Sequence, residues 1–274
     1  MPRIHHPAIR ATVLTAVVAL AASIVWAAGK APPANAAPDK AAVDKAFEAL
    51  RTYEWGQDRT PLAAIDQAIV ATYGGCWPRQ DLESRLAAVV VGKTPRAAKD
   101  FACRRLSLIA GADSVPVLAG LLTDKDLAHM ARFVLERMPD AAAGEALRGA
   151  LPKTAGALRI GCIVSLGVRR DEPSAPALAA LLADQDPAVV AAAATALGHV
   201  GTPPAAAALA DFLKKAPAGL KPVAADANLA CAERLLAAGK KLEAAAIYKS
   251  LTGEDLPKPV RVAAAKGLLA TAGP

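Results

Sequence analysis

Cysteine and histidine are the residues of this chain that could hold a metal, form a disulfide or act as a nucleophile. The cysteines are Cys76, Cys103, Cys162 and Cys231, and their spacing contains neither a CxxC nor a CxxCH motif. The sequence therefore indicates no thioredoxin-like redox site and no covalent haem attachment. We expect Cys76, within the segment GGCWP, to be the exposed thiol.

Other groups that could do chemistry are scattered. Beyond residue 36 the histidines are His129 and His199, and a repeat in the chain places them at different positions of units two apart. There is no HExxH, no GxSxG and no Walker-type phosphate loop. Acidic residues stand mostly in turns, where helix capping explains them: Asp124, Asp126, Asp184 and Asp186. The sequence thus predicts no catalytic residue, no metal and no cofactor.

The composition favours closely packed helices. The chain is 54% hydrophobic but only 4% aromatic, and about a quarter of it is alanine. Alanine has the highest helix propensity and fits between closely spaced helices, whereas β-sandwiches and barrels need β-branched and aromatic residues. We therefore expect an all-α fold. Disorder is not expected of a chain with 21% charged residues.

Residues 1–36 have the layout of a signal peptide and spacer. A basic start precedes an uncharged apolar stretch at residues 11–28. Small-x-small sites allow cleavage after Ala27 or Ala36, and the proline-rich stretch near the second site favours it. The alternative is an uncleaved membrane anchor, because about 18 apolar residues approach the length that spans a bilayer. In either case we expect the folded part to be periplasmic or secreted.

Removal of this segment lowers the net charge. The full chain carries +7, and residues 1–36 contribute Arg3, Arg10 and Lys30 without an acid, which leaves 29 basic and 25 acidic residues. A net charge of +4 is too mild to argue for nucleic acid. Four basic doublets fall at different repeat positions and form no continuous phosphate-binding column: Arg104-Arg105, Arg169-Arg170, Lys214-Lys215 and Lys240-Lys241.

A repeat of about 30 residues organises the middle of the chain. The segments FACRRLSL, MARFVLER, GCIVSLGV and AAATALGH align without gaps and share one leucine position: Leu106, Leu135, Leu166 and Leu197. A second leucine position keeps the same steps of 29, 31 and 31 residues: Leu118, Leu147, Leu178 and Leu209. Turn residues stand between the two positions. Each unit is therefore predicted to be a helix, a tight turn and a second helix.

Small residues precede the first leucine of each unit by four positions: Ala102, Ala131, Cys162 and Ala193. One turn of small side chains lets neighbouring helices approach closely. Cys162, and Cys231 four residues before Leu235, are therefore predicted to be packing residues. Asp186-Pro187 is predicted to cap a helix and begin it. Because neither helix can bury its apolar face alone, the units must stack into an α-solenoid.

These units resemble HEAT repeats, in particular the short bacterial type named after phycobilisome lyases. That type has the pattern D-x-x-V-R-x-x-A-A-x-A-L-G followed by P-x-L-x-x-L-L. The closest match is residues 186–198, where Ala191 replaces the usual arginine, and a later copy keeps it as Arg261. The resemblance covers roughly residues 94–213 and 257–271. It implies a scaffold architecture.

Residues 225–253 resemble a single tetratricopeptide (TPR) unit, because Gly239, Ala244 and Tyr248 match its turn glycine, small packing residue and aromatic. Upstream, three further helices are predicted at residues 39–54, 61–73 and 79–91. Five aromatic residues gather there and are expected to close the end of the stack, with an aromatic recognition patch as the alternative: Phe47, Tyr53, Trp55, Tyr73 and Trp77.

The predicted organisation has four parts, namely a signal peptide and spacer at 1–36, a helical cap at 37–92, HEAT-like repeats at 93–216, and a TPR-like unit with a final HEAT-like helix at 217–274. The resemblance implies that the second helix of each unit lines the concave side. The second helices at 114–122 and 174–182 contain no charged residue. Their non-core residues, with two tryptophans, form the candidate interaction surface: Val117, Ala119, Gly120, Ala177, Ala179, Ala180, Trp55 and Trp77.

An uncharged wall suits a protein surface or an apolar helix better than a polyanion. We therefore expect an exported scaffold that binds another protein and has no catalytic activity. An enzyme-class alternative is a lyase or chaperone-like cofactor-attachment protein, which only the phycobilisome-lyase resemblance suggests. A nucleic-acid-binding array is the third hypothesis.

The repeat register predicts that Leu166→Ala lowers the free energy of unfolding by about 2–5 kcal/mol, because it leaves a cavity between stacked helices. Thermal and denaturant unfolding of the variant measures this loss. Wild-type melting of Leu166→Ala would contradict the register.

Overall fold

The computed structural model describes residues 38–254 and 256–273. The apolar stretch at residues 11–28 and both cleavage sites lie outside these residues. Within the described part, the regular structure is helical, as the composition predicts, and no strand occurs. A search of the same residues finds no helix with the length and apolar character needed to cross a bilayer.

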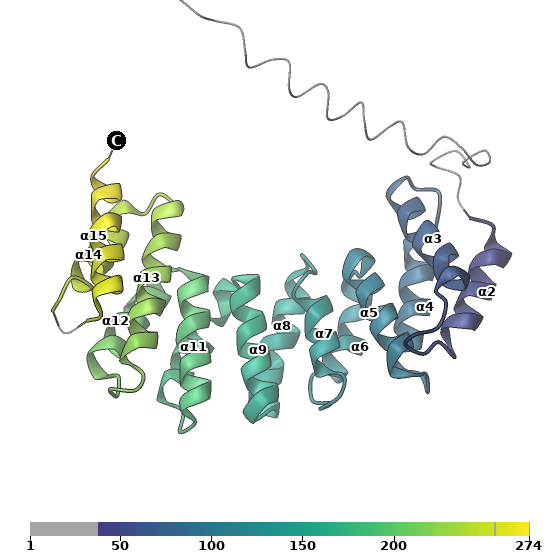
Figure 1. Cartoon of the computed structure of the whole chain (residues 1–274), viewed down its shortest axis with the longest axis horizontal. Coiled ribbons are helices and arrows are strands. Elements are labelled where there is room, and N and C mark those ends of the chain that lie inside the picture. The colour runs from purple at the N-terminus through teal and green to yellow at the C-terminus, as the bar shows by residue number, and fades with distance from the viewer. Residues whose placement is uncertain (1–37, 255, 274) are drawn as a thin grey trace, which may run out of the picture. The chain divides into compact units, whose positions relative to one another are not determined.

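Fourteen α-helices follow one another along the described residues (Figure 1). Their bounds are α2 Lys40–Leu50, α3 Ala63–Tyr73, α4 Arg79–Val91, α5 Arg96–Ile109, α6 Val115–Gly120, α7 Ala128–Leu135, α8 Ala141–Ala150, α9 Gly156–Arg169, α10 Ala175–Ala180, α11 Pro187–Val200, α12 Pro203–Lys215, α13 Lys221–Ala237, α14 Lys241–Ser250 and α15 Lys258–Ala272. Short 3₁₀ turns include η1 Thr60–Leu62 and η2 Ala112–Ser114.

From α5 onward the helices alternate between two layers. We call α5, α7, α9, α11, α13 and α15 the A helices, and α6, α8, α10, α12 and α14 the B helices. Each A helix packs against the A helix of the next unit and against B helices beside it, most extensively where α11 meets α9 and α13. This stack of helical pairs is the predicted α-solenoid.

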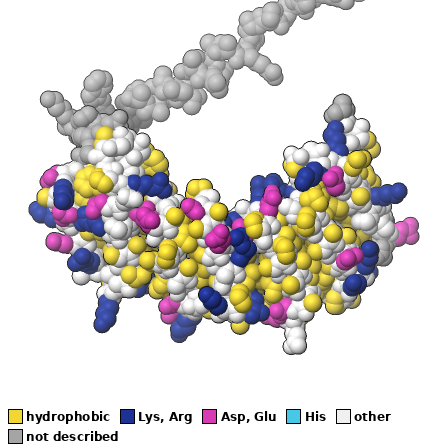
Figure 2. All heavy atoms as spheres, turned by 180° about the vertical axis from the view of Figure 1, so that it is seen from behind, with side chains coloured by type: hydrophobic (Ala, Val, Ile, Leu, Met, Phe, Trp, Pro, Cys, Tyr) yellow, Lys and Arg dark blue, Asp and Glu magenta, His cyan; other side chains and the backbone are white. Residues whose placement is uncertain are grey.

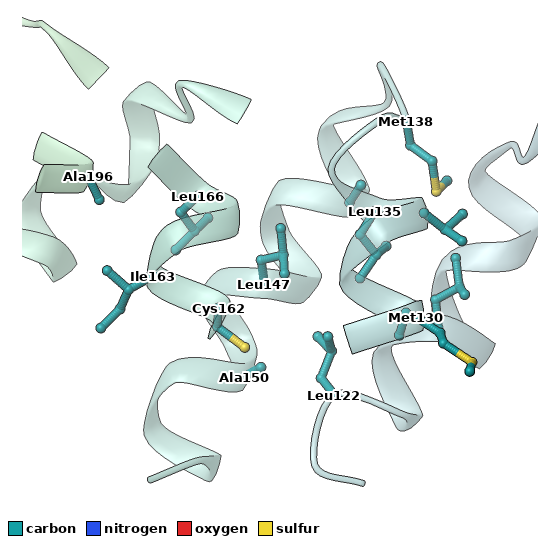
Figure 3. Close-up of a cluster of buried hydrophobic side chains, with 14 of the residues drawn as sticks. Leu122, Met130, Leu135, Met138, Leu147, Ala150, Cys162, Ile163, Leu166 and Ala196 are labelled. Carbon is teal, nitrogen blue, oxygen red and sulfur yellow. The ribbon is translucent and has the colours of Figure 1, made fainter. Parts of the chain in front are cut away.

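Both leucine positions are in the core. All eight leucines are fully buried: Leu106, Leu135, Leu166, Leu197, Leu118, Leu147, Leu178 and Leu209. Figure 3 shows Leu135, Leu147 and Leu166 directed into the space between α7, α8 and α9. Cys162 and Cys231 are fully buried as well, which confirms their prediction as small packing residues. The helix start at Asp186 is also confirmed, because its Oδ1 accepts the Ala188 N–H at 2.9 Å and Pro187 is the first helical residue.

Glycine allows neighbouring A helices to approach almost backbone to backbone. Gly167 and Gly198 each follow the leucine of their A helix. A Cβ atom on Gly167 would lie 2.9 Å from Ala196 Cα, and one on Gly198 would lie 2.7 Å from the Ala227 carbonyl oxygen. These distances are too short for any real contact, so the A-layer spacing requires glycine at both positions.

The cap at the N-terminal side contains the three predicted helices, α2, α3 and α4. The first is shorter than expected, because it ends at Leu50 and the chain then turns. The turn brings the Tyr53 ring edge-on to Phe101 of α5, with the ring centroids 6.2 Å apart. Phe47 and Tyr53 are thus core residues that seal the end of the stack, whereas Trp55 remains 61% exposed.

Near the other end, α13 and α14 form a helical hairpin. Gly239 joins them with a φ of +77°, a conformation that favours glycine. Ala244 and Tyr248 are buried, and the Tyr248 ring lies against Gly267 of α15, where a Cβ would be 2.4 Å from the ring. The hairpin and its turn agree with the sequence, while the TPR-like character of this unit stays a prediction.

The close approach of the A helices predicts that Gly198→Ala lowers the free energy of unfolding, although alanine favours a helix over glycine. Overpacking of about 1–3 kcal/mol should outweigh the roughly 1 kcal/mol by which alanine favours a helix over glycine. Gly149→Ala in α8 is the matched control, because nothing lies within 4 Å of its Cβ position, and it should be neutral or stabilising. Denaturant unfolding compares the two variants. Equal stabilisation by both would show that the A helices are not in tight contact.

Candidate functional site

The predicted surface on the B helices is exposed and uncharged, but its side chains are small. All six of its B-helix residues keep at least part of their surface open to solvent: Val117, Ala119, Gly120, Ala177, Ala179 and Ala180. Between α6 and α10 in the chain, α8 adds an exposed Glu145. Figure 2, which views the molecule from behind relative to Figure 1, shows broad hydrophobic areas in which alanine is included. Such a surface offers contact area but few anchoring side chains.

The two tryptophans of the candidate surface lie in the cap rather than on α6 or α10. Trp55 is in the turn between α2 and η1, and Trp77 precedes α4. Trp77 is half-buried and packs against the core, and its indole N–H is buried without a hydrogen-bond partner.

A surface groove of about 600 Å³ connects the cap to α6. Its walls come from α4 and from the start of the first unit: Gln80, Asp81, Glu83, Ser84, Ala87, Ala88, Val91, Asp113, Ser114 and Val117. Glu83 at its base accepts hydrogen bonds from the Gly111 N–H at 2.8 Å and the Ser114 hydroxyl at 2.6 Å. The carboxylate is therefore already used to join α4 to the first unit.

Large exposed hydrophobic side chains occur on several A helices, and also on α3, α4 and α14. Leu108 of α5 is 58% exposed, and Val164 and Val168 of α9 are 47% and 54% exposed. They lie two residues before or after the buried leucine of their helix, so one helical turn separates the two positions. We call the residues at these two positions of α5, α7 and α9 the outer ridge: Arg104, Leu108, Phe133, Arg137, Val164 and Val168.

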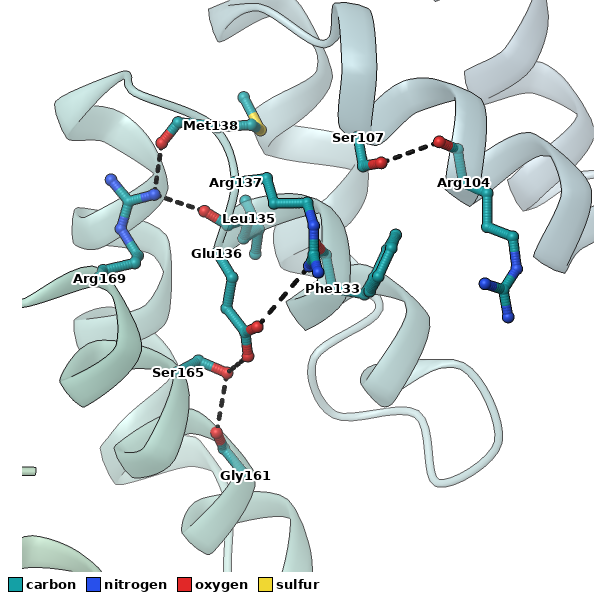
Figure 4. Close-up of polar contacts among 10 residues, drawn as sticks. All are labelled: Arg104, Ser107, Phe133, Leu135, Glu136, Arg137, Met138, Gly161, Ser165 and Arg169. Carbon is teal, nitrogen blue, oxygen red and sulfur yellow. Dashed lines mark hydrogen bonds and ion pairs between the residues drawn. The ribbon is translucent and has the colours of Figure 1, made fainter. Parts of the chain in front are cut away.

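The arginines of the outer ridge are held in place by the Phe133 ring. The Arg137 guanidinium carbon lies 3.8 Å from the ring centroid, and that of Arg104 lies 5.9 Å from it. Arg137 Nη1 also donates to the Phe133 carbonyl at 2.9 Å, and Arg104 Nε pairs with Asp100 at 2.8 Å. Figure 4 shows Arg137 folded over Phe133. Both guanidinium groups are thus oriented before any partner arrives.

Polar contacts fix α9 against α7 beneath the outer ridge. The Ser165 hydroxyl donates to Glu136 Oε1 at 2.6 Å, and Arg169 donates to the carbonyls of Leu135 and Met138 (Figure 4). Arg169 also donates to the Asp140 carbonyl. Burial lowers the pKa of Arg169, although the nearby Asp171 opposes that shift. These contacts set the spacing between the ridge residues of the two helices.

The apolar surface continues onto the cap. Tyr73 and Val70 of α3 are both exposed, and the Tyr73 hydroxyl donates to the Leu108 carbonyl at 3.2 Å. Exposed apolar side chains therefore extend from α3 across α5, with Phe133 of α7 half-buried, to α9.

Our sequence prediction missed the outer ridge, although the aligned segments contain its signal. The fourth position of the segments reads Arg104, Phe133, Val164 and Thr195, and the eighth reads Leu108, Arg137, Val168 and His199. The prediction from the sequence used only the leucine and small-residue positions of these segments. Large apolar side chains at these positions in three units, followed by polar ones in α11, mark a surface that the fold itself does not require.

In two of the basic doublets, the two arginines have different roles. Arg105 faces inward, where it makes two hydrogen bonds to Asp66 of α3 at 2.8 and 2.9 Å and stacks on Phe101 at 3.6 Å. Arg169 caps carbonyls of the preceding unit, while Arg104 and Arg170 are exposed. One member of each of these two doublets is therefore structural.

Side chains that could hold a metal ion are not clustered in the described residues. Among these residues, no three His, Cys, Asp or Glu side chains lie close enough to share a metal ion. His129 and His199 are exposed on α7 and α11. Cys76 is exposed, as predicted, and the other three cysteines are buried.

Comparison with known proteins identifies the repeats. Residues 144–227, from α8 into α13, match the family of HEAT repeats. No curated protein matches the sequence. Among solved structures, an engineered protein determined by crystallography is similar, with 20% sequence identity and a TM-score of 0.41, over 70% of this chain and 96% of the other. Residues 144–227 are therefore similar to HEAT repeats, a type of repeat that commonly mediates protein–protein interaction. The finer resemblance to lyase-type units stays a prediction.

The thiols should differ sharply in reactivity. Burial raises the pKa of Cys103 to about 12 and that of Cys231 to about 11, and burial also raises the pKa of Cys162. Since the thiolate is the reactive form, a disulfide reagent at pH 8 should modify one thiol per native chain quickly and all four only after denaturation. Cys76→Ser should abolish the fast phase, and two fast thiols would contradict the burial.

Proposed function

We propose that this chain is an exported scaffold that binds another protein and does not catalyse a reaction. The observation that carries the proposal is the stack of HEAT repeats, whose helices present rows of side chains on fixed supports. Repeat stacks of this kind offer long binding surfaces because each unit contacts only its neighbours and repeats the same exposed positions. The exposed hydrophobic side chains of the A helices support a role in binding.

Export is supported by the order of residues at the N-terminus. Basic residues, the apolar stretch at 11–28 and two small-x-small sites come before the first described helix. We propose that the processed chain is periplasmic or secreted, and that the chain is anchored in the membrane if the apolar stretch is retained.

The B-helix residues and the two tryptophans are the contact surface proposed from the sequence. The absence of charge on α6 and α10 and the position of Val117 in the groove beside α4 support it. We further propose that α13 and α14 act as a TPR-like unit that extends the stack, supported by the left-handed turn at Gly239.

The test is recovery of partners by the full chain. The chain is expressed in its own host with a C-terminal affinity tag, purified from envelope and cytoplasmic extracts, and its N-terminus is sequenced. The double variant Leu166→Asp, Leu197→Asp places charge at two fully buried positions and serves as the misfolded control. We expect the envelope extract to contain chain that begins at residue 28 or 37, with one stoichiometric protein partner that the control loses.

Two outcomes would overturn this proposal. Recovery of the chain only from the cytoplasm, with its N-terminus intact, would remove export. Recovery of a coloured cofactor or other small molecule in place of a protein, with transfer of that group to an acceptor, would replace the scaffold with the cofactor-attachment alternative.

A further inference from the structure

We propose that the outer ridge binds an acidic amphipathic helix of the partner protein, laid across α5, α7 and α9. This inference rests on the proposed function, because it names the surface and the chemistry of the partner that the scaffold would hold. It places the partner on the A helices and not on the B helices that the sequence favours.

The positions of the outer ridge hold different side chains in other units. Helix α11 has Thr195 and His199 where α9 has Val164 and Val168, and α13 has Glu233 and Ala237. All these residues lie at the surface, so the solenoid folds equally well with polar or small side chains there. The large exposed side chains of α5 and α9 therefore do not serve the core, and exposed apolar patches of this kind mark contact sites.

The A helices that carry the outer ridge have an excess of positive charge. Residues 96–109, 128–138 and 156–170 contain nine lysines or arginines and only two acids, Asp100 and Glu136. Some of the arginines act internally, but four are exposed at the surface: Arg96, Arg104, Arg137 and Arg170. Of these, Arg104 pairs with Asp100 and Arg137 with Glu136, so Arg96 and Arg170 are the exposed arginines that neither acid neutralises. The B helices of the same units differ, because α6 and α10 carry no charge and α8 carries one acid and one base, Glu145 and Arg148. An acidic partner would therefore be attracted to the A layer around the outer ridge and not to the B layer.

The spacing of the outer ridge matches the repeat of a helix laid across it. Packed helix axes lie about 8–10 Å apart, so successive rows of the outer ridge have that separation. A partner helix rises about 1.5 Å per residue, so side chains seven positions apart are about 10.5 Å apart along it. An apolar residue at every seventh position would meet Leu108, Phe133 and then Val164 or Val168. Acidic residues between them would meet Arg104 and Arg137.

A protein helix fits these features better than a lipid surface or a nucleic acid. Arg104 and Arg137 are fixed by Asp100 and by the Phe133 ring, and fixed guanidinium groups suit carboxylates held at a defined spacing. Leu108, Val164 and Val168 stand among the arginines, where a phosphate backbone would leave their apolar surface without a contact. Arginine is also among the residues that carry most of the binding energy in protein interfaces, and phenylalanine is enriched in such interfaces.

The experiment selects ligands for the processed full chain from a displayed library of random peptides about 20 residues long, a length that allows helix formation. We expect the enriched peptides to carry net negative charge and apolar residues at a spacing of seven. Their binding should weaken about tenfold or more in the double variant Val164→Glu, Val168→Glu. The matched control Thr195→Glu, His199→Glu changes the same two positions of α11 and should bind as wild type does.

A second pair of variants separates charge from folding. Arg137→Gln should weaken binding several-fold and reduce its dependence on salt, because it removes one charge that meets the peptide. Val164→Ser, Val168→Ser keeps the charge unchanged and replaces the glutamate variant if that variant unfolds. Thermal unfolding of each variant is measured alongside binding.

Several results would overturn the inference. They are enrichment of no peptide, enrichment of neutral or basic peptides, and binding that both valine variants leave unchanged. Peptide binding that Ala177→Glu, Ala180→Glu abolishes would move the site to the B helices and leave the scaffold proposal standing. Ridge-dependent binding of a DNA duplex, or of phosphatidylcholine vesicles containing phosphatidylglycerol, would replace the protein partner. The scaffold proposal is tested separately by the recovery of partners from the envelope extract, and only that experiment can overturn it.

Discussion

The closeness of neighbouring A helices is the constraint on which the structure depends. At α9, α11 and α13 the helices meet through Gly167 and Gly198, where no Cβ atom fits. Contacts this close give each helix many van der Waals partners although most of its core side chains are small. This explains how a chain with 4% aromatic residues forms a continuous core, and why about a quarter of it is alanine.

The same closeness limits which polar groups can lie between units. Several of those present form hydrogen bonds across the repeat, while Asn228 Oδ1 and Arg132 Nη1 are buried without a partner. The Arg169 guanidinium caps the end of the preceding unit, and Asn228 donates to the carbonyls of Leu209 and Ala224 at 3.0 and 2.8 Å. Glycine makes room for larger side chains in this layer as well, since a Cβ on Gly161 would collide with the Arg132 guanidinium. A buried leucine can shift slightly and remain buried. Each of these hydrogen bonds and close contacts, in contrast, forms in only one register of the two neighbouring units. They therefore fix how one unit sits on the next.

These two kinds of contact explain what the sequence could predict. Leu166 and Leu197 were recognisable because burial recurs at a fixed spacing, and the helix start at Asp186 has a local signal. The inward turn of Arg105 was not predictable, because its partner Asp66 lies 39 residues away and no periodicity connects them. The sequence favoured the B-helix surface because it lacks charge. A lack of charge says what is absent from a surface and does not identify side chains that could hold a partner. The outer ridge depends on the size and pairing of exposed side chains, and the leucine register alone does not determine those.

The outer ridge and the core are linked through the geometry of α7 and α9. Glu136 and Ser165 join the two helices on the side facing the core, so Phe133 and Val164 project from supports that cannot slide past each other. A surface whose side chains are already ordered loses less conformational entropy when a partner binds. In α11 the close contacts of Gly198 persist while the exposed positions become Thr195 and His199. Packing between units and composition of the exposed positions therefore vary independently along this chain, and that independence allows one repeated fold to carry a binding surface on only some of its units.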